Sequence, residues 1–486
     1  MAARNVRHLQ RSGHGTATQA PGGGGQRKGK GPRGHAERYQ PLPTGSHGLD
    51  PELVKRDQRS RLQSALIELI ADKGYPGVRI VDLAKLAHVS QPTFYTLFAD
   101  KEDLFLSTYD EITERTGRTI VKAYVGDAPH EQRMVAAMRA WAQLAAGEPQ
   151  ETSLLVLGAF GAGPKALERR RSILAELERR IHAGRSSIDR NASQVPGDFI
   201  VKAIIGGIRE VTATRLREGR ADELPELADE LTAWASCYPR RLPAELQAPP
   251  ARPPQVDGGR VPEPSERARR AEGRLPSGRS DLPRQFIVKS QSERIVDATA
   301  AIVAEKGLAA LTVPEIARRA NVSHQTFYNI YSSKHEAFLG AQKVGMHQAL
   351  VIAVEAYQAH GEDWPRAARA GLGALIEFLA SEPAHAHLSL VDTFAACPQA
   401  LEIRGATLRA FAAYFGPAYA LADGKLEVPA IAAEAIAGGI WQVLHHYVEN
   451  DCLDELPGAI PQLTYFALTP FLGPERALAY SLPESA

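Results

Sequence analysis

The sequence lacks several features that would place it in a common class of protein. Its three cysteines, in 486 residues, are too few and too scattered for a disulfide framework or a four-ligand zinc site. No apolar run reaches the roughly 18 residues of a membrane-spanning helix, and the best candidate, 431–448, is interrupted by polar side chains. The N-terminus has no apolar stretch typical of a secretory signal. These absences favour a cytoplasmic protein.

Net charge is also small, because 57 Lys and Arg residues are balanced by 56 Asp and Glu residues to give a formal net charge of +1. Any basic surface for nucleic acid must therefore be local. Two segments rich in Gly, Pro and Arg stand apart from the rest of the chain: residues 1–50 and 240–285. We expect the first to be a disordered basic tail and the second a flexible linker, since neither has enough apolar residues to form a core.

What the sequence does contain is a long internal repeat. VSQPTFYTLFADKEDLF, from Val89, returns as VSHQTFYNIYSSKHEAF from Val322, 233 positions later. GPKALE at Gly163 corresponds to CPQALE 234 positions later, and DELP at Asp222 recurs 232 positions later. An offset that drifts so little over this distance indicates duplication of a whole unit. Two units also suit a chain longer than a single hydrophobic core usually serves.

Apolar residues recur with the spacing of helices. Five in the first unit fall at positions i, i+3, i+4, i+7 and i+8, namely Leu62, Ala65, Leu66, Leu69 and Ile70, and 295–303 repeats this spacing. A glycine follows each predicted helix, as a left-handed C-cap requires. Strand patterns are hard to find, so we predict an all-α fold.

Each unit then has two short predicted helices joined by a tight turn, at 81–87 and 92–98 in the first unit and at 314–320 and 325–331 in the second. This is a helix-turn-helix arrangement, whose second helix can enter the major groove of DNA. Ser90 and Ser323 stand at the N-caps of these second helices. Thr312 and Glu315 form a capping-box pattern in the second unit.

These residues resemble a known family. The pattern T-F-Y-x-x-[FY]-x-x-K, after [DE]-[IL]-A-x-x-A-x-V-S, is similar to the N-terminal domain of the tetracycline-repressor (TetR) family of bacterial transcription regulators. The similarity covers about 50 residues in each unit; the regions that follow match only in length, helicity and place. It implies two tandem units, each with a helix-turn-helix DNA-binding domain (51–109 and 286–342) and a helical regulatory domain for ligand binding and dimerisation (110–239 and 343–486).

The resemblance also implies roles for particular side chains. Tyr95, Tyr328, Lys101 and Lys334 would contact phosphate, which sets register, whereas base contacts specify sequence. The side chains expected to face bases are Gln91, Pro92, Thr93 and Thr96 in the first unit and His324, Gln325, Thr326 and Asn329 in the second.

The chain departs from the family pattern at two places. Family members often begin the first short helix with a threonine that contacts phosphate while capping the helix. Thr312 fits, but the first unit has Arg79, which keeps a cation near phosphate without the cap. The family also often has histidine two residues after the tyrosine, where this chain has Leu97 or Ile330.

Family members usually act as homodimers, and a chain with two units can form that pair within itself. A flexible linker of about 45 residues spans on the order of 37 Å, and tethering gives an effective concentration in the millimolar range. Because the two recognition helices differ, we expect the DNA site to be an imperfect palindrome. The pairs Gly206-Gly207 and Gly438-Gly439 suit close helix packing where the units meet. Whether two such chains associate further is left open.

Aromatic residues in the regulatory domains are candidate lining for a small-molecule pocket: Trp141, Phe160, Phe378, Phe394, Phe411, Tyr414 and Trp441. Such residues are more often plain core. They are more numerous in the second unit, which favours a larger pocket there, or the only one.

The leading interpretation is a DNA-binding transcription regulator, most often a repressor in this family, that is released by an unidentified small-molecule effector and lies at the nucleoid when bound to DNA. An alternative is a regulator whose regulatory domains contact proteins without a small molecule. An enzyme is less favoured, since the sequence has no nucleophile-base signature, phosphate-binding glycine loop or paired metal motif. We therefore expect no catalytic residue, metal ligand or cofactor. Activation in place of repression is also left open.

Overall fold

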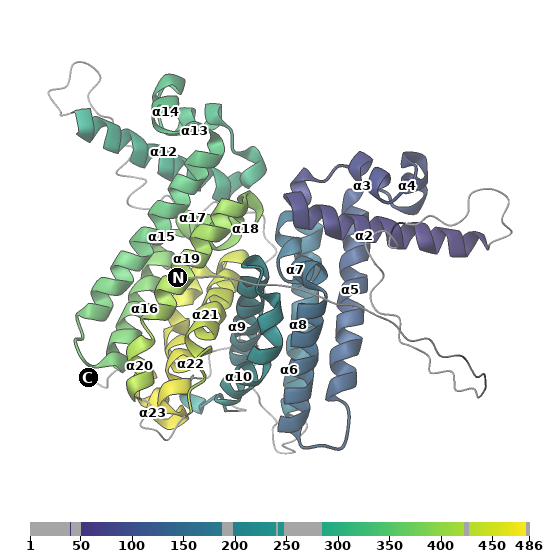
Figure 1. Cartoon of the computed structure of the whole chain (residues 1–486). Helices are drawn as coiled ribbons and strands as arrows, with labels where there is room; N and C mark the ends of the chain where they lie inside the picture. The colour runs from purple at the N-terminus through teal and green to yellow at the C-terminus, as the bar shows by residue number, and fades with distance from the viewer. Residues whose placement is uncertain are drawn as a thin grey trace, which may run out of the picture.

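The computed structural model describes Tyr39 and residues 50–186, 198–239, 242–246, 284–421 and 427–482. Every regular element in this part of the chain is a helix. The all-α fold predicted from apolar spacing is therefore confirmed. Figure 1 shows the two units side by side, with both helix-turn-helix domains at the same end of the helical body.

The first helix-turn-helix domain consists of α2 (Pro51–Gly77), α3 (Ile80–Leu86) and α4 (Gln91–Leu97), and α5 (Lys101–Tyr124) leads from it into the body. Each short helix begins one residue before its predicted range. The long helix α2 kinks at Gly74, whose φ of 69° is a left-handed conformation that glycine adopts without strain. Leu83, Phe94 and Phe98 are buried and join the helices into one core.

The second domain repeats this construction with α12 (Arg284–Lys306), α13 (Val313–Arg319) and α14 (His324–Ile330), followed by α15 (Lys334–Gln358). The left-handed residue after its first helix is Gly307, with a φ of 75°. Phe327 and Phe338 are buried in its core. The repeated sequence therefore folds into two equivalent domains.

The remaining helices form the body. In the first unit they are α6 (His130–Gly147), α7 (Pro149–Leu157), α8 (Pro164–Ser186), α9 (Asp198–Arg217) and α10 (Leu224–Ser236). In the second they are α16 (Trp364–Ser381), α17 (Pro383–His387), α18 (Thr393–Ala396), α19 (Pro398–Ala413), α20 (Gly416–Leu421), α21 (Ala432–Glu449), α22 (Ile460–Leu472) and α23 (Pro474–Ser481). A π-helical turn, Leu388–Asp392, separates α17 from α18.

Two expectations about the irregular segments need correction. Most of the expected tail (1–50) and linker (240–285) lies outside the described residues, but Tyr39 is buried and its hydroxyl donates to Glu68 Oε2 at 2.9 Å. Leu242 and Leu246, within the expected linker, are buried in the main core, because both are apolar and reach α22, where the Leu246 carbonyl accepts from Gln462.

One of the described helices has the length and composition that a membrane span requires. It is α15, not 431–448. Of its most apolar window, 44% is buried inside the protein, and α15 supplies core residues such as Phe338 and Met346. A core helix passes the same test of length and composition, so this is weak support for a span.

The two units meet where α9 crosses its equivalent, α21, at the two glycine pairs. A methyl group on Gly207 would collide with the Ala435 carbonyl and lie 2.5 Å from Trp234 Cη2. One on Gly439 would lie 2.6 Å from the Ala203 carbonyl oxygen. Ala203 and Ala435 are equivalent under the repeat, so the contact has pseudo-two-fold symmetry. Only residues without a side chain let the two backbones approach this closely.

Replacing Gly439 with alanine is expected to lower the free energy of unfolding by about 1–3 kcal/mol, the usual effect of overpacking a core. The control is Gly117→Ala in α5, where a methyl group meets nothing within 4 Å and alanine favours the helix. Urea unfolding followed by circular dichroism measures both. An unchanged midpoint for the Gly439 variant would contradict the described packing.

Candidate DNA-binding and effector sites

The side chains expected to face DNA lie on the exposed surface of α4 and α14. The exposed members of this set are Gln91, Pro92, Thr96, His324, Gln325 and Asn329. Tyr95 and Tyr328 are 57% and 55% exposed, although each stands next to a fully buried phenylalanine, Phe94 or Phe327. Each phenylalanine ring meets its tyrosine edge-on at 5.4 Å between ring centroids. Each recognition helix therefore holds one aromatic ring in its core and presents the next to solvent.

The threonines of this set take part in capping the recognition helices. Ser90 Oγ accepts from the backbone N–H of Thr93 at 3.1 Å and lies 2.7 Å from its hydroxyl. Ser323 and Thr326 repeat this arrangement at 3.0 and 2.9 Å. Both threonines are half-buried. The N-caps predicted at Ser90 and Ser323 are thus present, and they fix where each recognition helix begins.

The two lysines that begin α5 and α15 are turned toward the protein. Lys101 Nζ donates to the carbonyls of Tyr75 and Val78, both at 3.0 Å, and lies 4.1 Å from the centre of the Tyr75 ring. Lys334 Nζ donates to the Leu311 carbonyl at 2.9 Å. Burial lowers the pKa of Lys101. The sequence did not predict this structural role. The two lysines connect the start of α5 and of α15 to the segment before the first short helix of each domain.

The first short helices begin differently, as the sequence indicated. Thr312 Oγ1 accepts from the backbone N–H of Glu315 at 3.4 Å, whereas Arg79 makes no side-chain cap. The Arg79 guanidinium instead forms two hydrogen bonds with Asp82, at 2.9 and 3.0 Å. Hydrogen bonds from Arg79 and Lys73 lower the pKa of the Asp82 carboxyl. The Arg79 cation thus has a carboxylate partner within the domain.

A buried ion pair lies beside the place where α9 crosses α21. The equivalent positions on the other side of the pseudo-two-fold axis do not form such a pair. Arg404 donates to both carboxylate oxygens of Glu210, at 2.9 and 2.5 Å. Burial alone would raise the pKa of Glu210, but Arg404 holds it below its ordinary value. The equivalent arginine, Arg170, meets Gln442 at 3.4 Å, because glutamine stands there in place of glutamate. Burial and the charge of Arg209 lower the pKa of Arg170 to about 9.

Further polar contacts join unlike residues across the units. Arg215 forms hydrogen bonds with Glu434 at 3.0 and 3.1 Å, and Lys202 Nζ lies 3.0 Å from His446 Nε2. An ammonium group only donates, so the imidazole must accept and stay neutral at this nitrogen. Burial and the charge of Lys202 lower the pKa of His446 to about 4.

Three candidate pocket residues lie elsewhere, and this corrects the expectation for them. Phe160 and Phe394, equivalent under the repeat, stack on each other across the units with ring centroids 3.8 Å apart. Arg170 and Arg404 cover these rings. Trp141 packs in the core of the first unit, where its Nε1 donates to Thr212 at 3.3 Å. Aromatic content alone does not separate an interface or a core from a cavity wall.

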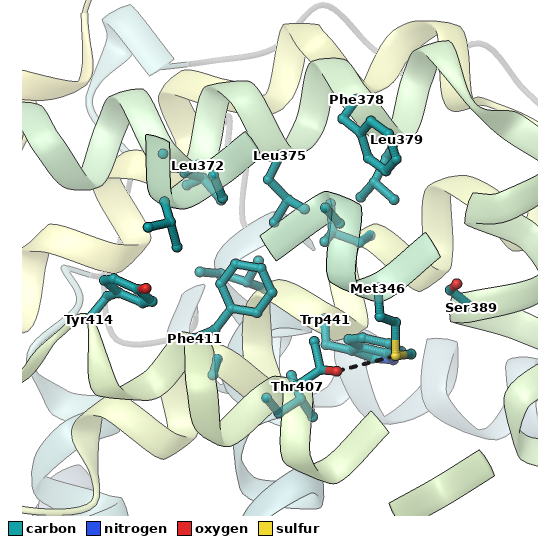
Figure 2. A pocket seen from close by; sticks show the side chains of 18 of the residues that line it. Met346, Leu372, Leu375, Phe378, Leu379, Ser389, Thr407, Phe411, Tyr414 and Trp441 are labelled. Atoms are coloured by element: carbon teal, nitrogen blue, oxygen red, sulfur yellow. Dashed lines mark hydrogen bonds between the residues drawn. The ribbon is translucent and has the colours of Figure 1, made fainter. Parts of the chain in front are cut away.

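The other four candidates, Phe378, Phe411, Tyr414 and Trp441, line a cavity of about 110 Å³ in the second unit. Helices α15, α16, α19, α21 and α22 enclose it, and Figure 2 shows the labelled side chains pointing into a common space. Among the described residues, no group of three His, Cys, Asp or Glu side chains is placed to hold a metal.

The buried ion pair yields a matched pair of variants. Glu210→Gln leaves Arg404 without a carboxylate in the interior and is expected to destabilise the protein by about 3–5 kcal/mol. Gln442→Glu at the equivalent position supplies a carboxylate to Arg170 and should not destabilise it. Chemical unfolding of both variants measures the difference. Equal losses of stability would show that the charge pairing has no such asymmetry.

Acid should weaken the contact between the units through His446. The folded protein keeps this imidazole neutral down to about pH 4, whereas an unfolded histidine titrates near pH 6.5, so the unfolded state binds more protons between these values. Stability is therefore expected to fall as the pH drops from about 6.5 to about 4. His446→Gln removes this component, and its loss of stability between pH 7 and pH 4.5 should be smaller than that of the wild type. Parallel unfolding curves for the two proteins would contradict the assignment.

Comparison with solved structures finds partial similarity to transcription regulators. The fatty acid degradation regulator FadR from Bacillus halodurans is 16% identical, the alignment covers 37% of this chain and 94% of that one, and the TM-score is 0.34. FadR from Bacillus subtilis, solved in complex with stearoyl-CoA, is 19% identical, with 36% and 96% covered and a TM-score of 0.32. A TetR-like regulator from Rhodococcus sp. RHA1 is 17% identical, with 38% and 96% covered and a TM-score of 0.31. No curated protein sequence matches the chain.

The family comparison is more direct. The sequence profile described as bacterial regulatory proteins, tetR family, matches the chain twice, over residues 62–108 and 295–340. These segments run from α2 to α5 and from α12 to α15, and so contain both helix-turn-helix domains. The chain therefore belongs to the tetR family and is a DNA-binding transcription regulator with two tandem units.

Proposed function

We propose that one chain acts as a complete repressor, in which the two recognition helices read the two unlike halves of one operator and a small molecule bound in the second unit causes release. The observation that carries the proposal is the pseudo-two-fold packing of α9 on α21. It unites the two units in one body, with both helix-turn-helix domains at the same end (Figure 1). Two recognition helices presented on one side are what a palindromic site requires.

On DNA, Tyr95 and Tyr328 would donate their exposed hydroxyls to phosphate. Arg79, Thr312, Lys101 and Lys334 would add phosphate contacts at the edges of each domain. For Lys101 this contact must come from the one ammonium proton that is not donated to Tyr75 or Val78. Such contacts fix affinity and register but carry no sequence information.

The proposed base readers differ between the units. Gln91, Pro92, Thr93 and Thr96 in α4 correspond to His324, Gln325, Thr326 and Asn329 in α14. Glutamine and asparagine can bond to adenine in a bidentate manner, whereas proline offers only apolar contact. The preferred operator should therefore have two unlike half-sites.

Charge across the contact supports pairing of unlike units. Arg215 meets Glu434, and Arg171 lies 3.9 Å from Glu449. The first-unit residues equivalent to these two glutamates are Lys202 and Arg217. Two first units packed together would thus place Lys202 near Arg215 and Arg217 near Arg171, and like charges in contact disfavour association. The Glu210–Arg170 pair would partly offset this repulsion.

Release by a ligand is supported by the course of α15. This helix begins at Lys334, which is bonded to the DNA-binding domain, and its residues Gly345, Met346 and Ala349 line the cavity. A ligand that alters the packing of α15 there would change the position of α14. It can release DNA only if its affinity differs between the DNA-bound and released states.

Exchange of the base-reading residues tests the unlike half-sites. Sites selected from random DNA by the wild type, at a fixed salt concentration, should form an imperfect palindrome. The variant Gln91→His, Pro92→Gln, Thr96→Asn gives the first recognition helix the residues of the second and should select a more symmetric site. Tyr95→Phe serves as the matched control, because loss of a phosphate contact should lower affinity about fivefold without changing the selected sequence. Identical symmetric sites for the wild type and the triple variant would contradict two unlike readers.

A further inference from the structure

We propose that the chain binds one effector, in the second unit only, and that this effector is an uncharged, largely apolar molecule with a hydrogen-bonding group at one end. That the bound molecule acts as an effector rests on the proposed function. Its binding, and the number bound per chain, can be measured without DNA. Three features carry the proposal: the chemistry of the cavity wall, a polar cluster at one end, and the residues that replace both in the first unit.

The cavity wall excludes a charged ligand. Its lining comes mainly from α15, α16, α19, α21 and α22, with further residues from α17 and the π-helical turn, and contains no Asp, Glu, Lys or Arg side chain. Leu372, Leu375, Phe378 and Phe411 are typical of the wall (Figure 2). An ionised group buried here would meet no carboxylate, ammonium or guanidinium group, which is strongly unfavourable. The cavity therefore favours a neutral, apolar body.

The polar end lies beside Gly345, where the side chains of His385 and Ser389 come close to the backbone of α15. A methyl group on Gly345 would lie 3.2 Å from His385 Nδ1 and 3.3 Å from Ser389 Oγ, so both atoms border the place where a side chain would stand. His385 is 5% exposed and its Nδ1 is buried without a hydrogen-bond partner. Its Nε2 lies 3.4 Å from Asp297, a contact that orients the ring.

A second unpartnered polar atom, this one a donor, belongs to the same cavity. Trp441 lines it, is 8% exposed, and its Nε1 is buried without a partner. Buried polar groups without partners are rare in folded proteins. A hydroxyl group of a ligand can both donate to His385 Nδ1 and accept from a neighbouring donor. The unused polar atoms of the cavity therefore suit a small neutral group such as a hydroxyl.

The first unit has other residues at the positions equivalent to the polar end of the cavity. Ile112 replaces Gly345 and Leu155 replaces Ser389. Both are buried, at 3% and 8% exposed, in the core of the first unit. Glu151 replaces His385 and pairs with Arg115. Larger apolar side chains thus stand where the second unit has the polar end of its cavity, and one ligand per chain follows.

Binding of N-phenyl-1-naphthylamine, an uncharged fluorescent probe, to the full-length protein tests the proposal. We expect one probe per chain, displacement by 1-decanol, and at least tenfold weaker displacement by decanoate, which is charged. Gly345→Ile, which copies the first unit, should weaken probe binding at least tenfold. Ile112→Val, the matched variant in the first unit, should leave binding unchanged.

Ser389→Leu provides a second variant in case Gly345→Ile disturbs folding, and thermal unfolding of both variants reports on that. Two probes per chain, equal displacement by decanoate, or full binding by a folded Gly345→Ile or Ser389→Leu protein would overturn the proposal. DNA binding is measured separately on the same variants. Probe binding with the expected pattern but without any effect on DNA would leave this inference standing and contradict release by a ligand.

Discussion

The approach of α9 to α21 at two glycine pairs is the constraint on which the arrangement of this protein depends. It brings the backbones of the two units together and sets the positions of Glu210, Arg404, Phe160 and Phe394 around a pseudo-two-fold axis. The contact forms a continuous core, since buried residues of both units belong to one hydrophobic cluster. The relative position of the two DNA-binding domains is therefore set by side-chain packing and does not rest on the linker alone.

Duplication made the two units equivalent, and three kinds of substitution have since made them unlike. Polar residues at the contact between the units differ in charge, as Lys202 and Glu434 do. Residues at the surface of the recognition helices differ in hydrogen-bonding capacity. Residues in the regulatory domains differ in size, as Ile112 and Gly345 do. A homodimer cannot separate these roles, because each substitution would appear in both subunits.

Sequence alone predicted the parts of the fold that local rules control. Apolar spacing and N-cap residues located the two short helices of each helix-turn-helix domain to within one residue. It did not predict the inward direction of Lys101 or the stacking of Phe160 on Phe394, because both depend on contacts between segments far apart in the chain. The constant repeat offset did contain a usable signal for the cavity, since Gly345 opposite Ile112 and Ser389 opposite Leu155 are visible in the sequence.

In the function proposed above, one chain supplies both readers of one operator. Native mass spectrometry of the full-length protein with its selected operator duplex counts chains per DNA directly. We expect one chain per duplex, with the same stoichiometry when protein and DNA are diluted together. Two chains on each duplex, or a complex that forms only as protein concentration rises, would contradict it and assign dimerisation to separate chains.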